Sequence, residues 1–145
     1  MKFKISENIK RIELHDSNID FLEINSDSII ITFDWAKLEN YNEENLDGLI
    51  LGKCKLELSG IIKKTFEIIT DEETKITEFP KDFQSRLEII GENESENDNH
   101  LRIGSLMNYD EKLAWTNWNL NFNKFNFYWN NHVTFEEWKK GAIAE

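Results

Sequence analysis

Three adjacent residues, His15, Asp16 and Ser17, are of the types that form the catalytic triad of a hydrolase. A triad needs a serine, a histidine and a carboxylate whose side chains converge in space, whereas neighbours in a strand or turn point in different directions. We therefore expect a structural role, in which Asp16 or Ser17 accepts backbone N–H bonds where the chain turns into its first hairpin. No other pattern supports catalysis, and we predict that the protein is not an enzyme.

The residue types that bind metals are too scattered to predict a metal site. His15, His100 and His132 share no metal-ligand spacing, and Cys54 is the single cysteine. The acidic run at 92–98 lacks the alternating ligands and central glycine of an EF-hand loop. The sequence also lacks a phosphate-binding glycine loop and a nucleophile elbow. We predict neither a metal nor another cofactor.

Negative charge is the strongest feature of the composition. The net charge of −11 argues against nucleic acid and anionic membranes as direct partners, because both would repel the chain. Residues 12–52 contain ten acids against one base, and residues 87–111 contain seven against one. Such segments are either solvated faces and loops or a surface for a basic protein partner. For that second reading, we expect the partner-binding residues to be Asp16, Asp20, Glu23, Glu43, Glu44, Asp47, Glu92, Glu94, Glu96 and Asp98.

Five tryptophans suggest a different kind of chemistry, the stacking of aromatic rings on sugars. Trp115 and Tyr109 are the aromatic residues that are freest to be exposed. Trp118 and Trp129 fall on an apolar face, where packing in the core explains them better. A carbohydrate-binding or structural β-sandwich module without catalysis is therefore the alternative to a protein-binding role.

The clearest structural element is the stretch WNLNFNKFNFYW at 118–129. Apolar residues alternate at 118, 120 and 122 and again at 125, 127 and 129, with Asn123 and Lys124 between the two runs. This pattern predicts a hairpin with a two-residue turn, in which Trp118 lies opposite Trp129. Its apolar face would be buried. A homodimer is possible, because the edges of the hairpin are unpaired and could pair with a second copy.

Alternating runs at 19–24 and 29–35 predict a second hairpin around a two-residue turn at 26–27. This register places Ile24 opposite Ile29 and Asp20 opposite Phe33. It avoids the longer turn, which would set Asp20 against a like charge.

Further strands are predicted on either side of Ser59-Gly60, which we interpret as a turn, with Cys54 on the inner face. At the C-terminal end, Thr134 and Glu137 form a capping box that begins a helix running to about residue 144. Phe135 and Trp138 would lie on its inner face.

Strand signals recur every ten to twelve residues, which predicts a mainly β fold over one domain, 1–145. We expect an antiparallel β-sandwich or barrel-like sheet with one short C-terminal helix. The charged first residues are unlike a secretory signal, and no stretch approaches the roughly 18 apolar residues of a membrane helix. A single cysteine suits a reducing compartment, so we predict a soluble cytoplasmic protein.

Three segments, IELHDSNIDFLEI, IIITFDWAKL and LGKCKLELSGI, resemble a group of small bacterial β-rich proteins in which an HDS or HDA tripeptide opens a hairpin. Some members are assigned as immunity proteins, which protect a bacterium from its own polymorphic toxin, and others are uncharacterised. The resemblance covers about residues 12–66. Asp16 and Ser17 match the tripeptide, and no catalytic residues carry over. The resemblance implies a β-rich domain, and together with the acidic segments it favours an inhibitor that presents carboxylates to a basic toxin where phosphates would otherwise bind.

Overall fold

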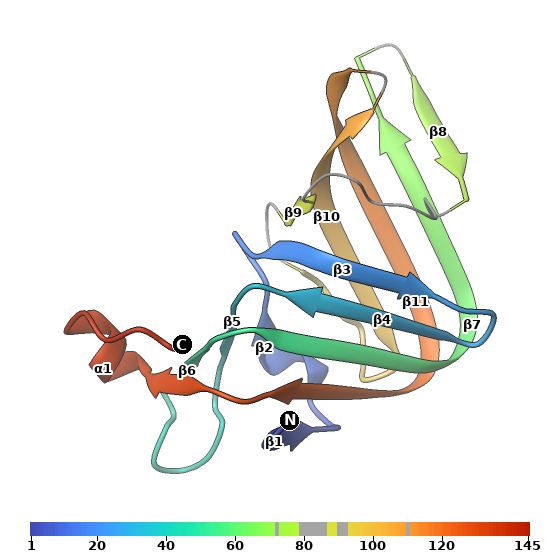
Figure 1. Cartoon of the computed structure of the whole chain (residues 1–145). Helices are drawn as coiled ribbons and strands as arrows, with labels where there is room; N and C mark the ends of the chain where they lie inside the picture. The colour runs from blue at the N-terminus through green and yellow to red at the C-terminus, as the bar shows by residue number, and fades with distance from the viewer. Residues whose placement is uncertain (72, 79–86, 90–92, 110) are drawn as a thin grey trace.

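The computed structural model describes residues 1–71, 73–78, 87–89, 93–109 and 111–145, and it is mainly β, with antiparallel sheets (Figure 1). One sheet has eight strands: β1 (Phe3–Ile5), β3 (Asn18–Ile24), β4 (Ser28–Phe33), β7 (Cys54–Ile69), β8 (Thr74–Thr77), β9 (Leu87–Ile89), β10 (His100–Tyr109) and β11 (Lys112–Trp129). The other has four: β2 (Ile12–Glu13), β5 (Ala36–Leu38), β6 (Leu49–Leu51) and β12 (His132–Thr134). The 3₁₀ helix η1 (Ile9–Arg11) and the α-helix α1 (Phe135–Lys139) complete the described elements. The predicted fold class is confirmed.

The larger sheet folds over to make two layers, because β7 and β11 each contribute to both. These strands pair along almost their whole length, from Trp115 opposite Ile69 to Trp129 opposite Cys54. Figure 1 shows both strands bending at the same corner. The first layer holds β1, β3, β4, residues 54–59 and residues 124–129, and the second holds β8, β10, residues 63–69 and residues 112–121. Short β9 pairs with β10 and β3 and so links the layers.

Gly60 forms the corner in β7. Its φ of +66° lies in the left-handed region that glycine adopts without steric cost. A Cβ at this position would lie 2.8 Å from the Cβ of Asn123 on β11, so the two strands approach too closely here for any other residue. The carbonyl of Asp27, at the tip of the β3–β4 hairpin, accepts N–H bonds from Gly60 (3.0 Å) and Ile61 (3.3 Å). Strands that change layer through such a bulge are typical of orthogonal sandwiches.

The predicted hairpin at 118–129 and the predicted turn at Ser59-Gly60 are both wrong, and the corner explains both errors. Lys124 pairs with Ser59, so the two breaks in alternation face each other inside continuous strands. At a bend, as at a turn, the alternation of inward-facing and outward-facing residues is interrupted and then starts again, so the two look alike in the sequence. The predicted inner face is nevertheless confirmed, since these six residues are at most 1% exposed: Trp118, Leu120, Phe122, Phe125, Phe127 and Trp129.

The β3–β4 hairpin has the predicted two-residue turn, closed by the bond from Asn25 N–H to the Ser28 carbonyl (2.9 Å). Ile24 pairs with Ile29, as predicted. Asp20 does not lie opposite Phe33, because the register shifts between residues 19 and 21 and Ile19 takes that place. The bulge turns Asp20 outward, where it is exposed.

Cys54 faces the core and is fully buried, as predicted. Burial raises the pKa of its thiol, and the negative charges of Asp34 and Asp20 raise it further. The thiol therefore stays protonated and packs as a small apolar group.

The capping box of α1 is confirmed, with the Thr134 Oγ1 accepting from Glu137 N–H (3.1 Å) and the Glu137 carboxylate accepting from Thr134 N–H (2.9 Å). The helix ends at Lys139 and not near residue 144, because Gly141 takes a φ of +97°. No residue of α1 is fully buried: Phe135 is half-buried, while Trp138 is exposed, so the predicted inner face is wrong for Trp138. No helix in the described ranges is long and apolar enough to cross a membrane.

We predict that Gly60→Ala lowers the free energy of unfolding by about 2 kcal/mol, because it combines an unfavourable φ with a clash against Asn123. Gly141→Ala is the matched control, since Gly141 also has a positive φ but a methyl group there would meet nothing within 4 Å. It should cost less than Gly60→Ala, about 1 kcal/mol, because it introduces the unfavourable φ without the clash. Urea unfolding of both variants measures the difference.

Combining Gly60→Ala with Asn123→Gly should recover part of the loss, because it removes the atoms that the new methyl group meets. Equal destabilisation by Gly60→Ala and Gly141→Ala would show that the corner is not sterically tight.

Candidate protein-binding surface

The residues His15, Asp16 and Ser17 occupy a tight turn before β3 and do not form a triad. His15 Nε2 and Asp16 Oδ1 lie 3.6 Å apart on the exposed side of the turn. Ser17 is fully buried, and its Oγ donates to the Trp35 carbonyl (2.7 Å). Asp16 has a φ of +67°, and its N–H donates to the Ile89 carbonyl. The predicted structural role of these residues at the turn is confirmed, but the predicted contact is wrong, because the Ser17 hydroxyl donates to a carbonyl where it was expected to accept a backbone N–H bond.

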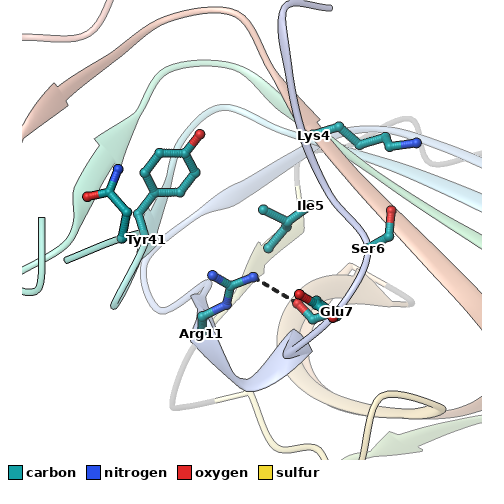
Figure 2. A pocket seen from close by; sticks show the side chains of 7 residues that line it. Lys4, Ile5, Ser6, Glu7, Arg11 and Tyr41 are labelled. Atoms are coloured by element: carbon teal, nitrogen blue, oxygen red, sulfur yellow. Dashed lines mark hydrogen bonds between the residues drawn. The ribbon is translucent and has the colours of Figure 1, made fainter. Parts of the chain in front are cut away.

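A hollow of about 500 Å³ lies between the N-terminal segment and the loop after β5 (Figure 2). Arg11, one of the residues that line it, is already engaged: its guanidinium donates to the carbonyls of Glu7 (2.9 Å), Asn8 (3.4 Å) and Asn40 (3.4 Å). Figure 2 shows Arg11 turned toward Glu7, and Lys4 pointing away from both Arg11 and Tyr41. Arg11 therefore acts as a clamp that joins the N-terminal segment to the start of the loop after β5.

That loop, residues 39–48, connects β5 to β6 and contains Glu43, Glu44 and Asp47; we call it the acidic loop. Its first end is fixed by the Arg11 clamp and by the bond from Glu39 N–H to the Arg11 carbonyl (2.9 Å). Its last end is fixed by the bond from Phe135 N–H to the Gly48 carbonyl (3.1 Å). Both ends are thus tied to other parts of the fold.

The interior of the acidic loop is held by its own asparagines. Asn42 Oδ1 accepts N–H bonds from Glu44 (3.0 Å) and Asn45 (2.9 Å), as in an Asx turn. The Asn45 carbonyl in turn accepts from Gly48 N–H (3.2 Å), and Gly48 has a φ of +97°. These hydrogen bonds fix the backbone of the acidic loop in the protein alone, without a partner.

Strand pairing sets the acidic loop beside α1. The loop runs directly into β6, while α1 follows directly from β12, and Thr134 pairs with Leu49. Figure 1 shows the loop and α1 at one end of the molecule, far from β8. The first turn of α1 and the end of the loop consequently share one hollow of about 310 Å³.

Four acidic residues line this hollow: Glu43, Glu44, Asp47 and Glu136. Within the described part of the chain, no Lys, Arg or His nitrogen lies within 4.0 Å of their carboxylates. Leu46 and Phe135 line the same hollow, and Trp138 stacks on Phe135 with ring centroids 5.7 Å apart. We call these residues, Glu43, Glu44, Leu46, Asp47, Phe135, Glu136 and Trp138, the loop–helix surface.

The other predicted partner-binding residues do not join this surface. Asp16 lies at the turn before β3, and Asp20 and Glu23 lie exposed on β3, which Figure 1 shows well apart from the acidic loop. Glu94 and Glu96 border a separate hollow of about 200 Å³ that also contains His100 and Arg102.

Asp98 has an internal role, because its carboxylate accepts N–H bonds from Asn8 (2.9 Å) and Ile9 (2.8 Å) at the start of η1. Glu92 lies outside the described residues. Of the ten predicted residues, the structure thus gathers Glu43, Glu44 and Asp47 and adds Glu136.

Sequence reasoning missed the apolar part of the loop–helix surface. Leu46 is the one apolar aliphatic residue within the polar run ENYNEENLD, and that isolation was the available signal. It is 64% exposed. Trp138, which was expected to face inward, is 45% exposed.

Trp115 is exposed on the outer face of β11, as predicted, and its indole N–H donates to Asn117 Oδ1 (3.1 Å). Leu113 on the same strand and Ile76 on β8 are also exposed. The side chain of Tyr109 lies outside the described residues. On β8 and β11, the second layer therefore exposes Trp115, Leu113 and Ile76 to solvent.

Comparison with known proteins adds no assignment: no protein-family model, no curated protein and no solved structure matches this chain. Among the residues that the structure describes, no three His, Cys, Asp or Glu side chains are grouped as a metal site requires.

His132 connects the core to α1. The buried Trp129 donates its indole N–H to His132 Nδ1 (3.0 Å), so this nitrogen must be unprotonated. Burial lowers the pKa of His132, and the nearby negative charge of Glu137 partly offsets this effect. The pKa of Glu137 is lowered by the hydrogen bonds from Thr134. The folded protein therefore favours the neutral form of His132 and the ionised form of Glu137, and acid protonates both groups.

We predict that His132 makes stability fall as the pH drops below about 6.5, its ordinary pKa. Between the lowered folded pKa and this unfolded value, the unfolded chain binds more protons, so acid favours unfolding. Thermal unfolding at pH 7.5 and pH 5.5 measures the effect. His132→Gln, whose amide oxygen can still accept from Trp129, should lose less stability on acidification than the wild type. An identical loss in both proteins would contradict the assignment.

Proposed function

We propose that this protein is an immunity protein that acts in the cytoplasm, where it binds a basic toxin through the loop–helix surface and blocks it. The observation that carries the proposal is the sharing of one hollow by Glu43, Glu44, Asp47 and Glu136, without a basic group within 4.0 Å in the described chain. Like charges held together raise the free energy of the unbound protein, and a basic partner relieves this repulsion.

The order of the acidic loop supports tight binding. Asn42 and the Gly48 carbonyl hold the backbone through hydrogen bonds, so less conformational entropy is lost when a partner binds. The carboxylates also lie at one end of a chain with a net charge of −11, which steers a basic partner toward the protein.

Inhibition follows from the chemistry of the partner. A basic nuclease binds phosphates with Lys and Arg residues, and carboxylates presented on a fixed loop can occupy the same positions. The resemblance over about residues 12–66 to proteins assigned as immunity proteins supports the same role. This role requires no catalysis, and it leaves the buried Ser17 as part of the fold.

A second candidate, a carbohydrate-binding module, is favoured by one observation. Trp115 is 38% exposed on the outer face of a sheet, beside the amide of Asn117, and such rings stack on sugars. Titration with glycans should then quench tryptophan fluorescence, and Trp115→Ala should abolish the quenching. A structural module would show neither a glycan response nor a protein partner.

We predict that the wild-type chain, used as bait in a lysate of the organism that encodes it, retains one stoichiometric basic protein at low salt and releases it at high salt. The charge-reversal variant E43K/E44K/D47K should bind the purified partner at least about tenfold more weakly at low salt, mainly through a slower association rate. Surface plasmon resonance across a salt series measures both rates.

The matched control is D71K/E73K/E78K, which changes the charge equally at three exposed sites near β8. It should reduce affinity much less, because only the overall field changes. If both variants weakened binding equally, net charge alone would account for the attraction and the loop–helix surface would be the wrong contact.

A further inference from the structure

Leu46 is a fixed apolar group surrounded by acids. Its side chain is 64% exposed, while the backbone on either side is held by Asn42 and Asn45. The exposure is therefore built into the loop. A single exposed leucine is ordinary, whereas one that adjoins other exposed apolar groups indicates an interaction site.

The neighbouring apolar groups come from α1. Phe135 lines the same hollow as Leu46, and its ring is held by three contacts: Trp138 stacks on it at an interplanar angle of 25°, and the Nζ atoms of Lys37 and Lys139 each lie 4.6 Å from its centroid. Cations at this distance are attracted to the ring. Trp138 is thereby positioned with 45% of its surface exposed, on a helix that buries no residue. Its ring contributes nothing to the core.

We propose that Leu46 and Trp138 form the apolar centre of the loop–helix surface, with Phe135 supporting the Trp138 ring, and that both insert into an apolar pocket of a basic protein, where Lys and Arg residues surround that pocket. This inference rests on the proposed function and specifies the partner's surface. Interfaces commonly place aromatic and aliphatic groups at the centre and charges at the rim. The carboxylates then accelerate association, and the apolar centre slows dissociation.

The charges of the loop–helix surface select this occupant among the alternatives. The charged residues that line the hollow are all acidic, namely Glu43, Glu44, Asp47 and Glu136, and they outnumber the two lysines over the Phe135 ring, so an anionic membrane or a nucleic acid would be repelled. A second copy of the chain would bring the same four carboxylates against one another, at a net charge of −11 for each copy. A basic protein surface satisfies both the apolar and the acidic groups.

The test uses the full chain and two lysine-rich peptides of equal length and charge, one containing several leucines and the other serine at each of those positions. Calorimetric titration at low salt gives both affinities. The leucine peptide should bind the wild type about tenfold more tightly, the amount expected from burying part of one or two apolar side chains. Leu46→Asn should remove this advantage and leave the affinity for the serine peptide unchanged.

Leu113→Asn is the matched control, because Leu113 is similarly exposed but lies on β11 in the second layer. This variant should keep the full advantage of the leucine peptide. Both substitutions are at exposed sites, and unchanged melting temperatures would verify that each variant is folded.

Four outcomes would contradict the inference or the function on which it rests. Equal binding of the two peptides to the wild type would show that the apolar centre does not contribute to binding, and it would not contradict the proposed charge-based function. Loss of the advantage in Leu113→Asn and not in Leu46→Asn would move the apolar contact to the second layer. A concentration-dependent dimer that Leu46→Asn abolishes would assign the centre to a second copy of the chain. Binding of neither peptide at low salt would count against the proposed function itself.

Discussion

The contact between Gly60 and Asn123 is the constraint on which the arrangement of both layers depends. Two neighbouring strands can change layer together only if they bend at matched positions, and the close approach at Gly60 excludes a side chain there. The Asp27 carbonyl satisfies the two N–H groups that the bulge frees from the ladder. The tip of the β3–β4 hairpin thus fixes the corner. Without this bend, the buried residues of β11 on either side of Asn123 would not enclose one core.

The same two strands determine where the loop–helix surface lies. Residues 54–59 of β7 follow β6 and the acidic loop, while residues 124–129 of β11 lead into β12 and α1. The pairing of β6 with β12 continues that order, so the loop and the helix meet at one end. Arg11, Asn42 and the capping box of Thr134 then fix the surface locally. Long-range pairing brings the acids together, and short-range hydrogen bonds hold them in place.

The sequence was sufficient to predict the features that depend on local alternation or capping. The inward face of residues 118–129, the turn of the β3–β4 hairpin and the capping box all follow from patterns of a few residues. The corner could not be predicted, because a bend and a turn interrupt alternation in the same way until the partner strand is known. A count of charges identified Glu43, Glu44 and Asp47, but the addition of Glu136 and the internal role of Asp98 depend on contacts between distant segments.

The most direct test of the central claim is amide hydrogen exchange of the full chain, alone and with the basic protein that it retains at low salt. The proposed contact predicts that added protection is concentrated at residues 42–48 and 135–139, with little change on β3 or at residues 94–96. Protection centred on β3, on residues 94–96 or on the outer face of β11 would show that the partner binds elsewhere and would contradict the proposed contact.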